Sequence, residues 1–232
     1  MIMKIFSLEN DIIFKEEYIN VHQIQDKKLF ANVINSLNDN INGIQNTKER
    51  IIILDNDTEI KMEKEALMVI DLFNIDFNQK KIQSALYNKI EKIYKQEFER
   101  MSEFQTLFQK LQLNVLDVFN EFPFEFNYKD SIGIQEYLKL LGLKISNNKG
   151  EIIDKIFSLI DAVEYLSVAK LLIFVNLKLY LSDDELNEIY KYAMYKKVNI
   201  LLIETGEEKE PIKNEKILFV DSDYDEIVLY NK

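Results

Sequence analysis

The chain has 232 residues and a mass of 27.6 kDa, which leaves room for one large domain or two small ones. Its composition, 47% hydrophobic and 30% charged, is that of a folded globular protein, and its formal charge of −11 excludes a protein whose whole surface is basic. The chain contains no cysteine and one histidine, which excludes disulfides, cysteine nucleophiles and zinc sites built from several histidines.

The N-terminal third predicts strands with one helix between them. Residues 1–21 alternate apolar and polar side chains, which indicates two short strands, and residues 24–38 carry apolar side chains at helical spacing. Residues 51–54 and 59–62 flank a polar turn and predict a hairpin. The apolar run at 67–70 predicts a central strand.

The middle of the chain is predicted to be helical. Residues 79–121 carry apolar side chains three and four positions apart, and part of this pattern is a heptad seam. The seam consists of Met101, Phe104, Phe108, Leu111, Val115 and Val118. The pattern predicts one long helix, or two helices with a break near residues 99–101, ended by Pro123. Residues 132–141 and 151–166 predict two further helices.

The C-terminal part returns to alternating strands and helices. A strand at 171–175 is followed by a helix that begins with a capping box at Ser182, and then by a strand at 198–203. This strand–helix–strand unit predicts parallel pairing with a right-handed crossover. Residues 217–220 and 227–230 predict the last two strands.

Together these elements predict an α/β fold with a helical insertion. We expect a head domain of residues 1–75 and 167–232 and a helical leg domain of residues 76–166. The five glycines do not form a phosphate loop or a dinucleotide-binding motif, so nucleotide hydrolysis is not expected. The N-terminus does not resemble a signal peptide and the longest apolar run has five residues, so we expect a cytoplasmic protein without a membrane segment.

Acidic residues offer two candidate sites, and each has a simpler explanation. Asp55, Asp71 and Glu204 lie at predicted strand ends, where active sites of α/β enzymes occur, which leaves a nuclease or nucleotide hydrolase as an alternative. No accompanying histidine or lysine constellation supports that alternative, and His22 is expected at a helix entry or on the surface. A second group of acids surrounds Pro123 and could bind a hard cation such as calcium, or could simply be solvated.

Lysines cluster at four places along the chain, and each cluster by itself is typical of a solvated face. The clusters are Lys27-Lys28, Lys80-Lys81, Lys139 with Lys144 and Lys149, and Lys196-Lys197.

The order of several segments resembles that of a known family. The matching segments are residues 6–8, 67–71, 137–145, 170–176, 181–185 and 199–204. In this order, and at this length, the chain resembles the type II-A CRISPR-associated spacer-acquisition protein, the toroidal DNA-end-binding family, in its short subtype. No single motif carries the resemblance, which rests on the colinear order of strands, helical arm and strands.

The resemblance implies an ATPase-like α/β head with an inserted helical leg domain and no functional P-loop. It implies a ring-shaped homotetramer that binds double-stranded DNA ends through its hole, without sequence specificity and without being an enzyme. It also implies calcium ions that stabilise the ring, and an antiviral role in adaptation, the acquisition of new spacers, together with the CRISPR integrase pair and effector nuclease of the same system. The alternative is a protein–protein scaffold of the adaptation complex with no direct role on DNA.

The resemblance also suggests which residues serve these roles. Lys139 and Lys144 match basic positions of the family and are the first candidates for DNA binding. Glu125 and Asp130 match acidic positions and are the first candidate calcium ligands. The remaining candidates are Lys149, Lys27 and Lys28 for DNA, and Glu121 and Asp117 for the metal; Asn127 and Ser131 stand where the family has acids.

Net charge sets a physical condition on DNA binding. A tetramer would carry a formal charge of −44, four times −11, which opposes DNA at long range. Binding therefore requires that lysines face the hole while acidic residues face outward. Because charges are screened over about 8 Å at physiological salt, distant acids would not cancel nearby lysines.

Overall fold

The structure, a computed structural model, describes residues 1–44, 47–146 and 150–231. The chain forms two compact units. The first consists of Met1–Asp76 and Asn147–Lys232, and we call it the head; the second, Phe77–Ser146, is the leg.

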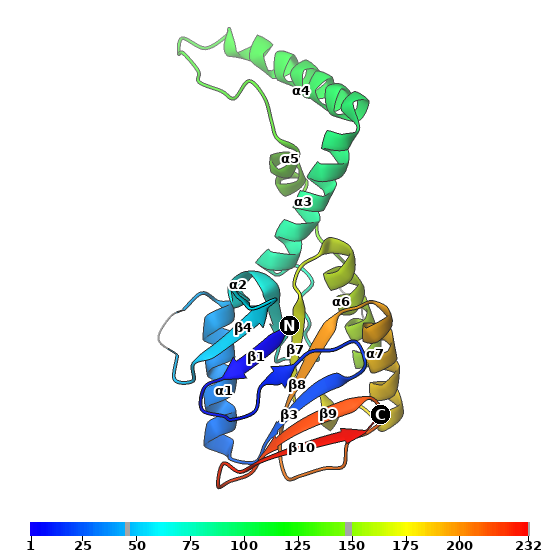
Figure 1. Cartoon of the computed structure of the whole chain (residues 1–232). Coiled ribbons are helices and arrows are strands. Elements are labelled where there is room, and N and C mark those ends of the chain that lie inside the picture. Colours follow the sequence, from blue (N-terminus) through cyan, green and yellow to red (C-terminus); the bar gives the residue numbers. More distant parts are fainter. Residues whose placement is uncertain (45–46, 147–149, 232) are drawn as a thin grey trace. The chain divides into compact units, whose positions relative to one another are not determined.

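The head is built on a six-stranded sheet with the order β10-β9-β3-β8-β7-β6 (Figure 1). The strands are β3 (Ile19–Ile24), β6 (Ala66–Val69), β7 (Leu171–Val175), β8 (Asn199–Thr205), β9 (Glu215–Val220) and β10 (Glu226–Asn231). All pairs are parallel except β9 with β10. The predicted parallel pairing of β7 and β8 is confirmed, and the apolar runs of these strands are buried because elements cover both faces of the sheet.

A second, antiparallel sheet and one helix cover one face of the large sheet. The sheet has the order β2-β1-β4-β5, and the helix is α1 (Lys27–Ile41). Its strands are β1 (Ile2–Ile5), β2 (Ile12–Ile13), β4 (Ile51–Asp55) and β5 (Thr58–Ile60), followed by the short helix α2 (Met62–Glu65). Met3 and Ile53 from the small sheet, Leu37 from α1, and Ile173 and Leu201 from the large sheet share one apolar core.

Two helices, α6 (Ile152–Leu166) and α7 (Asp183–Tyr195), lie on the other face of the large sheet (Figure 1). A 3₁₀ turn, η1 (Leu177–Leu179), connects β7 to α7, whose predicted capping box is confirmed by hydrogen bonds between Ser182 and Glu185. Helix α6 was predicted to lie in the leg, whereas it belongs to the head. The reason is that the apolar side of α6 finds its partners there, including the ring of Tyr192, which meets Phe157 edge to face.

The leg contains α3 (Lys80–Gln96), α4 (Phe98–Phe119) and α5 (Ile134–Leu140). The predicted long helix is divided in two, at Glu97. Tyr87, Ile134 and Leu138 form a small apolar core on which residues of α3 and α4 pack. All 22 residues of α4 are described, and none of them is buried.

His22 differs from its prediction. It lies in the central strand β3 and is fully buried, with Nδ1 3.3 Å from the carbonyl oxygen of Leu218. Burial lowers the pKa of His22 to about 4.

None of the helices within the described residues is both long enough and apolar enough to cross a bilayer.

Candidate nucleic-acid interface

The predicted DNA-binding lysines are divided between the two units. Lys139 lies on α5 and Lys144 follows it, both exposed on the leg, whereas Lys27 and Lys28 are exposed in the first turn of α1 on the head. Lys149 lies outside the described residues. The structure therefore does not bring these lysines onto one surface of a single unit.

Charge is distributed very unevenly between the units. Residues 77–146 contain ten lysines and arginines against nine acids, a net charge of +1. The rest of the chain contains the other 19 basic and 31 acidic residues, a net charge of −12. The leg is thus the part of the chain that a polyanion can approach with least repulsion.

Within the leg, the positive charge lies mainly on α3. Its lysines are Lys80, Lys81, Lys89, Lys92 and Lys95, and its one acidic residue is Glu91, so the helix carries +4. Lys80 and Lys81 form one of the predicted lysine clusters, whereas Lys89, Lys92 and Lys95 belong to none of them. Their signal was present in the sequence, because they lie between the apolar positions that predicted the helix.

The surroundings of Lys139 are closer to neutral. Glu136 on the same helix accepts hydrogen bonds from Lys129 Nζ at 2.5 Å and from the backbone N–H of Gly133 at 3.1 Å. These bonds, the one from Lys129 first, hold the pKa of Glu136 below its usual value. A phosphate group near Lys139 would therefore also meet an ionised carboxylate.

The predicted calcium ligands do not form a metal site within one chain. Asp117 lies near the end of α4, and Glu121, Glu125 and Asp130 lie in the segment that follows; all four are exposed. Among the described residues, no three acidic or histidine side chains are grouped so that they could hold a metal ion. These four carboxylates, as they lie in the single chain, therefore do not fit calcium.

The three acids of the enzyme alternative do not share a site. Asp55 contacts Lys170, at the end of the sheet where β7 begins, whereas Asp71 follows the carboxyl end of β6. Asp71 accepts the backbone N–H groups of Phe73 and Asn74 and so shapes its own turn. Glu204 is buried near the end of β8.

The start of α1 occupies the place where a phosphate would sit in a nucleotide-binding fold. Gln25 and Asp26 alone connect β3 to α1, and the Asp26 carboxylate accepts the backbone N–H of Leu29 at 2.7 Å. Helix N-termini bind phosphate through such N–H groups. In this chain a carboxylate already uses this group, and its negative charge would repel a phosphate.

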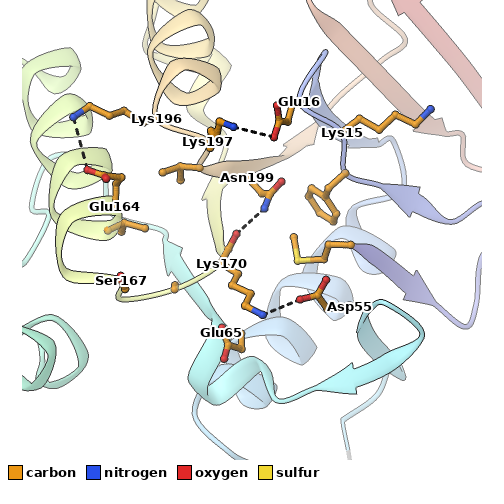
Figure 2. Close-up of a pocket in the computed structure, with 15 residues that line it drawn as sticks. Lys15, Glu16, Asp55, Glu65, Glu164, Ser167, Lys170, Lys196, Lys197 and Asn199 are labelled. Carbon is orange, nitrogen blue, oxygen red and sulfur yellow. Dashed lines mark hydrogen bonds and ion pairs between the residues drawn. The ribbon is translucent and has the colours of Figure 1, made fainter.

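A pocket of about 600 Å³ lies at the opposite end of the sheet, where β7 and β8 begin (Figure 2). Four lysines line it, and three of them are paired with acids: Lys170 with Asp55 at 2.8 Å, Lys196 with Asp161 at 2.8 Å, and Lys197 with Glu16 at 3.8 Å. Both α6 and α7 end beside the pocket, and helix C-termini carry partial negative charge. The pocket is therefore poorly suited to an anion, although its lysines are numerous.

Comparisons with known proteins show a single family. A family model described as CRISPR-associated protein (Cas_Csn2) matches residues 43–224, more than half of the chain. A protein described as CRISPR-associated protein Csn2 from Streptococcus agalactiae is 26% identical over 162 residues, which cover 67% of this chain and 70% of that protein. A protein of the same description from Enterococcus faecalis is 29% identical over 144 residues, which cover 60% of this chain and less than two thirds, 64%, of that protein.

The fold has a counterpart among solved structures. The crystal structure of Stu0660 of Streptococcus thermophilus matches with a TM-score of 0.62 and 13% identity, over 100% of this chain and 77% of that chain. At this low identity the likeness shows the fold alone, a mixed α/β protein with two sheets and a helical segment.

Proposed function

The chain belongs to the Csn2 family of CRISPR-associated proteins, a family of type II-A adaptation, and from this premise we propose that it binds double-stranded DNA ends without sequence specificity during spacer acquisition. The DNA-binding form is a ring-shaped homotetramer, and the duplex end enters its hole. The protein contacts phosphates and performs no chemistry on DNA. In this proposal the head is an ATPase-like domain without a functional P-loop.

The observation that carries the proposal is the separation of charge between head and leg. Nonspecific DNA binding depends on lysine and arginine contacts to phosphates. A chain of charge −11 can make such contacts only where its acids are absent or screened. The leg, with a net charge of +1 against −12 for the rest, supplies a surface of this kind.

The leg also supports assembly. Leu111 is 63% exposed and Val118 is 50% exposed, although both belong to the heptad seam of α4. Seams of this type pack against other helices. We propose that α4 of another copy covers this seam in the homotetramer.

We propose that calcium binds to the assembled tetramer and not to the single chain. The four candidate carboxylates do not gather within the described part of one chain, and calcium takes six to eight oxygen ligands. We propose that further ligands come from another copy. The CRISPR integrase pair and effector nuclease of the same system are the proposed protein partners.

A comparison of linear with closed circular duplex of the same sequence tests the proposal. We expect gel retardation of the linear duplex and little retardation of the circle, because a ring must be threaded over an end. Light scattering on the same sample must give the mass of a tetramer. Equal retention of both forms would contradict threading, and failure to retain linear duplex at low salt with the tetramer intact would favour the protein–protein scaffold.

A further inference from the structure

We infer that one face of α3 makes the main contact with the phosphate backbone of the duplex. This lysine face consists of Lys81, Lys89, Lys92 and Lys95. The inference rests on the proposed function, because it assigns the DNA contact to a particular surface. It differs from the residues suggested by family resemblance, which lie on α5, on α1 and in the segment after α5.

The position of the lysines around the helix is the first argument. With 3.6 residues per turn, the four lysines lie within a sector of about 120°. The apolar residues Leu86, Tyr87, Ile90 and Tyr94 lie in the opposite sector and belong to the core of the leg. The lysine face is therefore the side of α3 that points away from this core.

Contacts of the core-facing side confirm this orientation. The Tyr87 hydroxyl donates a hydrogen bond to the carbonyl oxygen of Leu143 at 3.1 Å, and the Tyr87 side chain is buried against Ile134 and Leu138. Ile134 and Leu138 belong to α5, which lies beside α3 (Figure 1). Lys92 is exposed, and the Lys95 side chain is 64% exposed.

The local charge is the second argument. Glu91 is the one acid of α3, and it pairs with Lys95 across one turn, with Nζ 2.8 Å from Oε1. An exposed ion pair of this kind is weak, and a phosphate can replace its carboxylate at little cost. Lys92 adds an exposed charge, and Glu91, already paired with Lys95, does not balance it. Lys81 and Lys89 are half-buried and have interactions of their own.

The length of the face matches a duplex backbone. Lys81 and Lys95 are 14 positions apart, so they lie about 21 Å apart along the helix axis. At 3.4 Å per nucleotide along one strand, this distance corresponds to about six phosphates. Lysines on a smooth helix can reach phosphates but carry no information about bases, so the contact is independent of sequence.

The acidic head of another copy is an alternative partner that a basic face would also attract. The duplex is the stronger candidate because its charge is denser, one negative charge per about 1.7 Å of helix axis. The experiment separates the two by measuring mass as well as binding.

The test compares two triple variants with the same change in net charge. The first is Lys89→Gln, Lys92→Gln and Lys95→Gln on the lysine face. The second, a control, changes three exposed head lysines, Lys61→Gln, Lys191→Gln and Lys213→Gln, which form no ion pair within the described part of the chain. A further variant of the face with arginine at the three positions retains the charge.

Binding of each variant to linear duplex is measured as a function of salt concentration, with the mass determined by light scattering. We expect the glutamine variant of the lysine face to bind more than about tenfold more weakly at 0.1 M salt. The slope of log K against log salt should fall by about 2.7 for each chain in contact, because each lost phosphate contact removes about 0.9. The arginine variant and the head control should behave like the unchanged protein.

Three outcomes overturn the inference in different ways. If the unchanged protein binds linear duplex and the face variant binds equally well, the placement of the contact is wrong while the proposed function stands. If the face variant loses its oligomeric mass, the face binds another copy. If the unchanged protein does not bind linear duplex at low salt, the proposed function itself fails, and the inference with it.

Discussion

Lys178, Glu204 and Glu215 are charged side chains that the fold removes from water. Lys178 Nζ donates to both carboxylate oxygens of Glu215, at 2.8 and 2.9 Å, and the Tyr190 hydroxyl donates to the same carboxylate at 2.6 Å. Burial, followed by the nearby Glu215 charge, raises the pKa of Tyr190 well above its ordinary value. Sequence patterns do not reveal this network, because its members come from η1, from α7, from the end of β8 and from the start of β9.

Glu204 makes stability depend on pH. Burial raises its pKa to about 7, although its carboxylate accepts the backbone N–H of Lys178 at 3.1 Å. In the unfolded chain this group titrates near its ordinary value of 4.5. Between pH 4.5 and 7 the folded protein binds more protons at Glu204 than the unfolded chain does. The contribution of Glu204 to stability is therefore fully present below pH 4.5 and is lost as the pH rises through 7.

We therefore expect Glu204→Gln to become more stable, relative to the unchanged protein, as the pH rises from 4.5 to 7.5. Over this pH range, the free energy of unfolding of the variant should rise by about 3 kcal/mol relative to that of the unchanged protein. The reason is that a neutral amide has no buried charge to desolvate. Urea unfolding at several pH values measures it.

His22 also makes the stability of the protein depend on pH, and this effect must be separated from that of Glu204. The pKa of His22 is lowered by burial, so its contribution is lost as the pH falls from 6.5 to 4, which is the opposite sign. Because both proteins contain His22, its effect cancels in the difference between them. A difference that stays constant across this range would mean that Glu204 is not the titrating group.

Among the elements, α4 differs most between what its sequence predicts and how much of it is buried. Its heptad seam predicts a packed helix, yet none of its 22 described residues is buried in the single chain. The partly extended segment after α4 returns alongside it, where Gln105 Nε2 donates to the carbonyl of Ile132 and Gln112 Nε2 to that of Lys129. Met101 and Phe104 of the seam pack against the core of the leg, whereas Leu111, Val115 and Val118 remain open to a partner.

Substitution of the seam should separate assembly from folding. We expect Leu111→Asp with Val118→Asp to lower the mass measured by light scattering from tetramer toward monomer. The helical signal in circular dichroism should be retained, because exposed positions contribute little to the stability of the chain, within about 0.5 kcal/mol each.

The control adds the same two charges to α4 outside the seam, as Ser102→Asp with Gln109→Asp, both at exposed positions. This variant should keep the tetramer mass. If both variants keep it, the seam is not a contact between copies.

At the scale of the whole molecule, charge is the property that decides which partners can approach. The total of −11 suggests repulsion from DNA, but the separate units differ by 13 charges, +1 against −12. Because charges are screened over about 8 Å at physiological salt, a phosphate responds mainly to the charges nearest to it. Calcium, if it binds between copies, acts at this same scale.

We expect calcium to raise the melting temperature of the tetramer and a chelator to reverse the rise. At a calcium concentration 100 times the Kd, the stabilisation should be about 2.7 kcal/mol. The variant Glu125→Gln with Asp130→Asn should lose most of this response. Differential scanning calorimetry with calcium, magnesium or chelator provides the measurement.

A matched variant, Glu99→Gln with Glu103→Gln, removes two exposed acids from the first half of α4 and should respond like the unchanged protein. If both variants respond equally, Glu125 and Asp130 are not ligands. If the unchanged protein does not respond, calcium is not part of the assembly.

Much of the fold was predictable, because hydrophobic periodicity reports directly on helices and strands. The runs at 171–175 and 198–203 predicted parallel strands, and both were confirmed, since buried parallel strands need apolar residues on both faces. The helix at 151–166 was also predicted, but its assignment to the leg was wrong. An apolar stripe indicates that one face of a helix is buried, but it does not identify the segment that covers that face.

By itself, the sequence determined the strand and helix pattern, the missing phosphate loop, the total charge and the family resemblance. The tertiary structure alone decided that His22 is buried, that Asp55 and Asp71 lie at opposite ends of the sheet, and that the lysine face of α3 points away from the core of the leg. The physical reason is that periodicity and composition are local properties of the chain. Burial, pairing and the grouping of charge depend on which distant segments fold against one another.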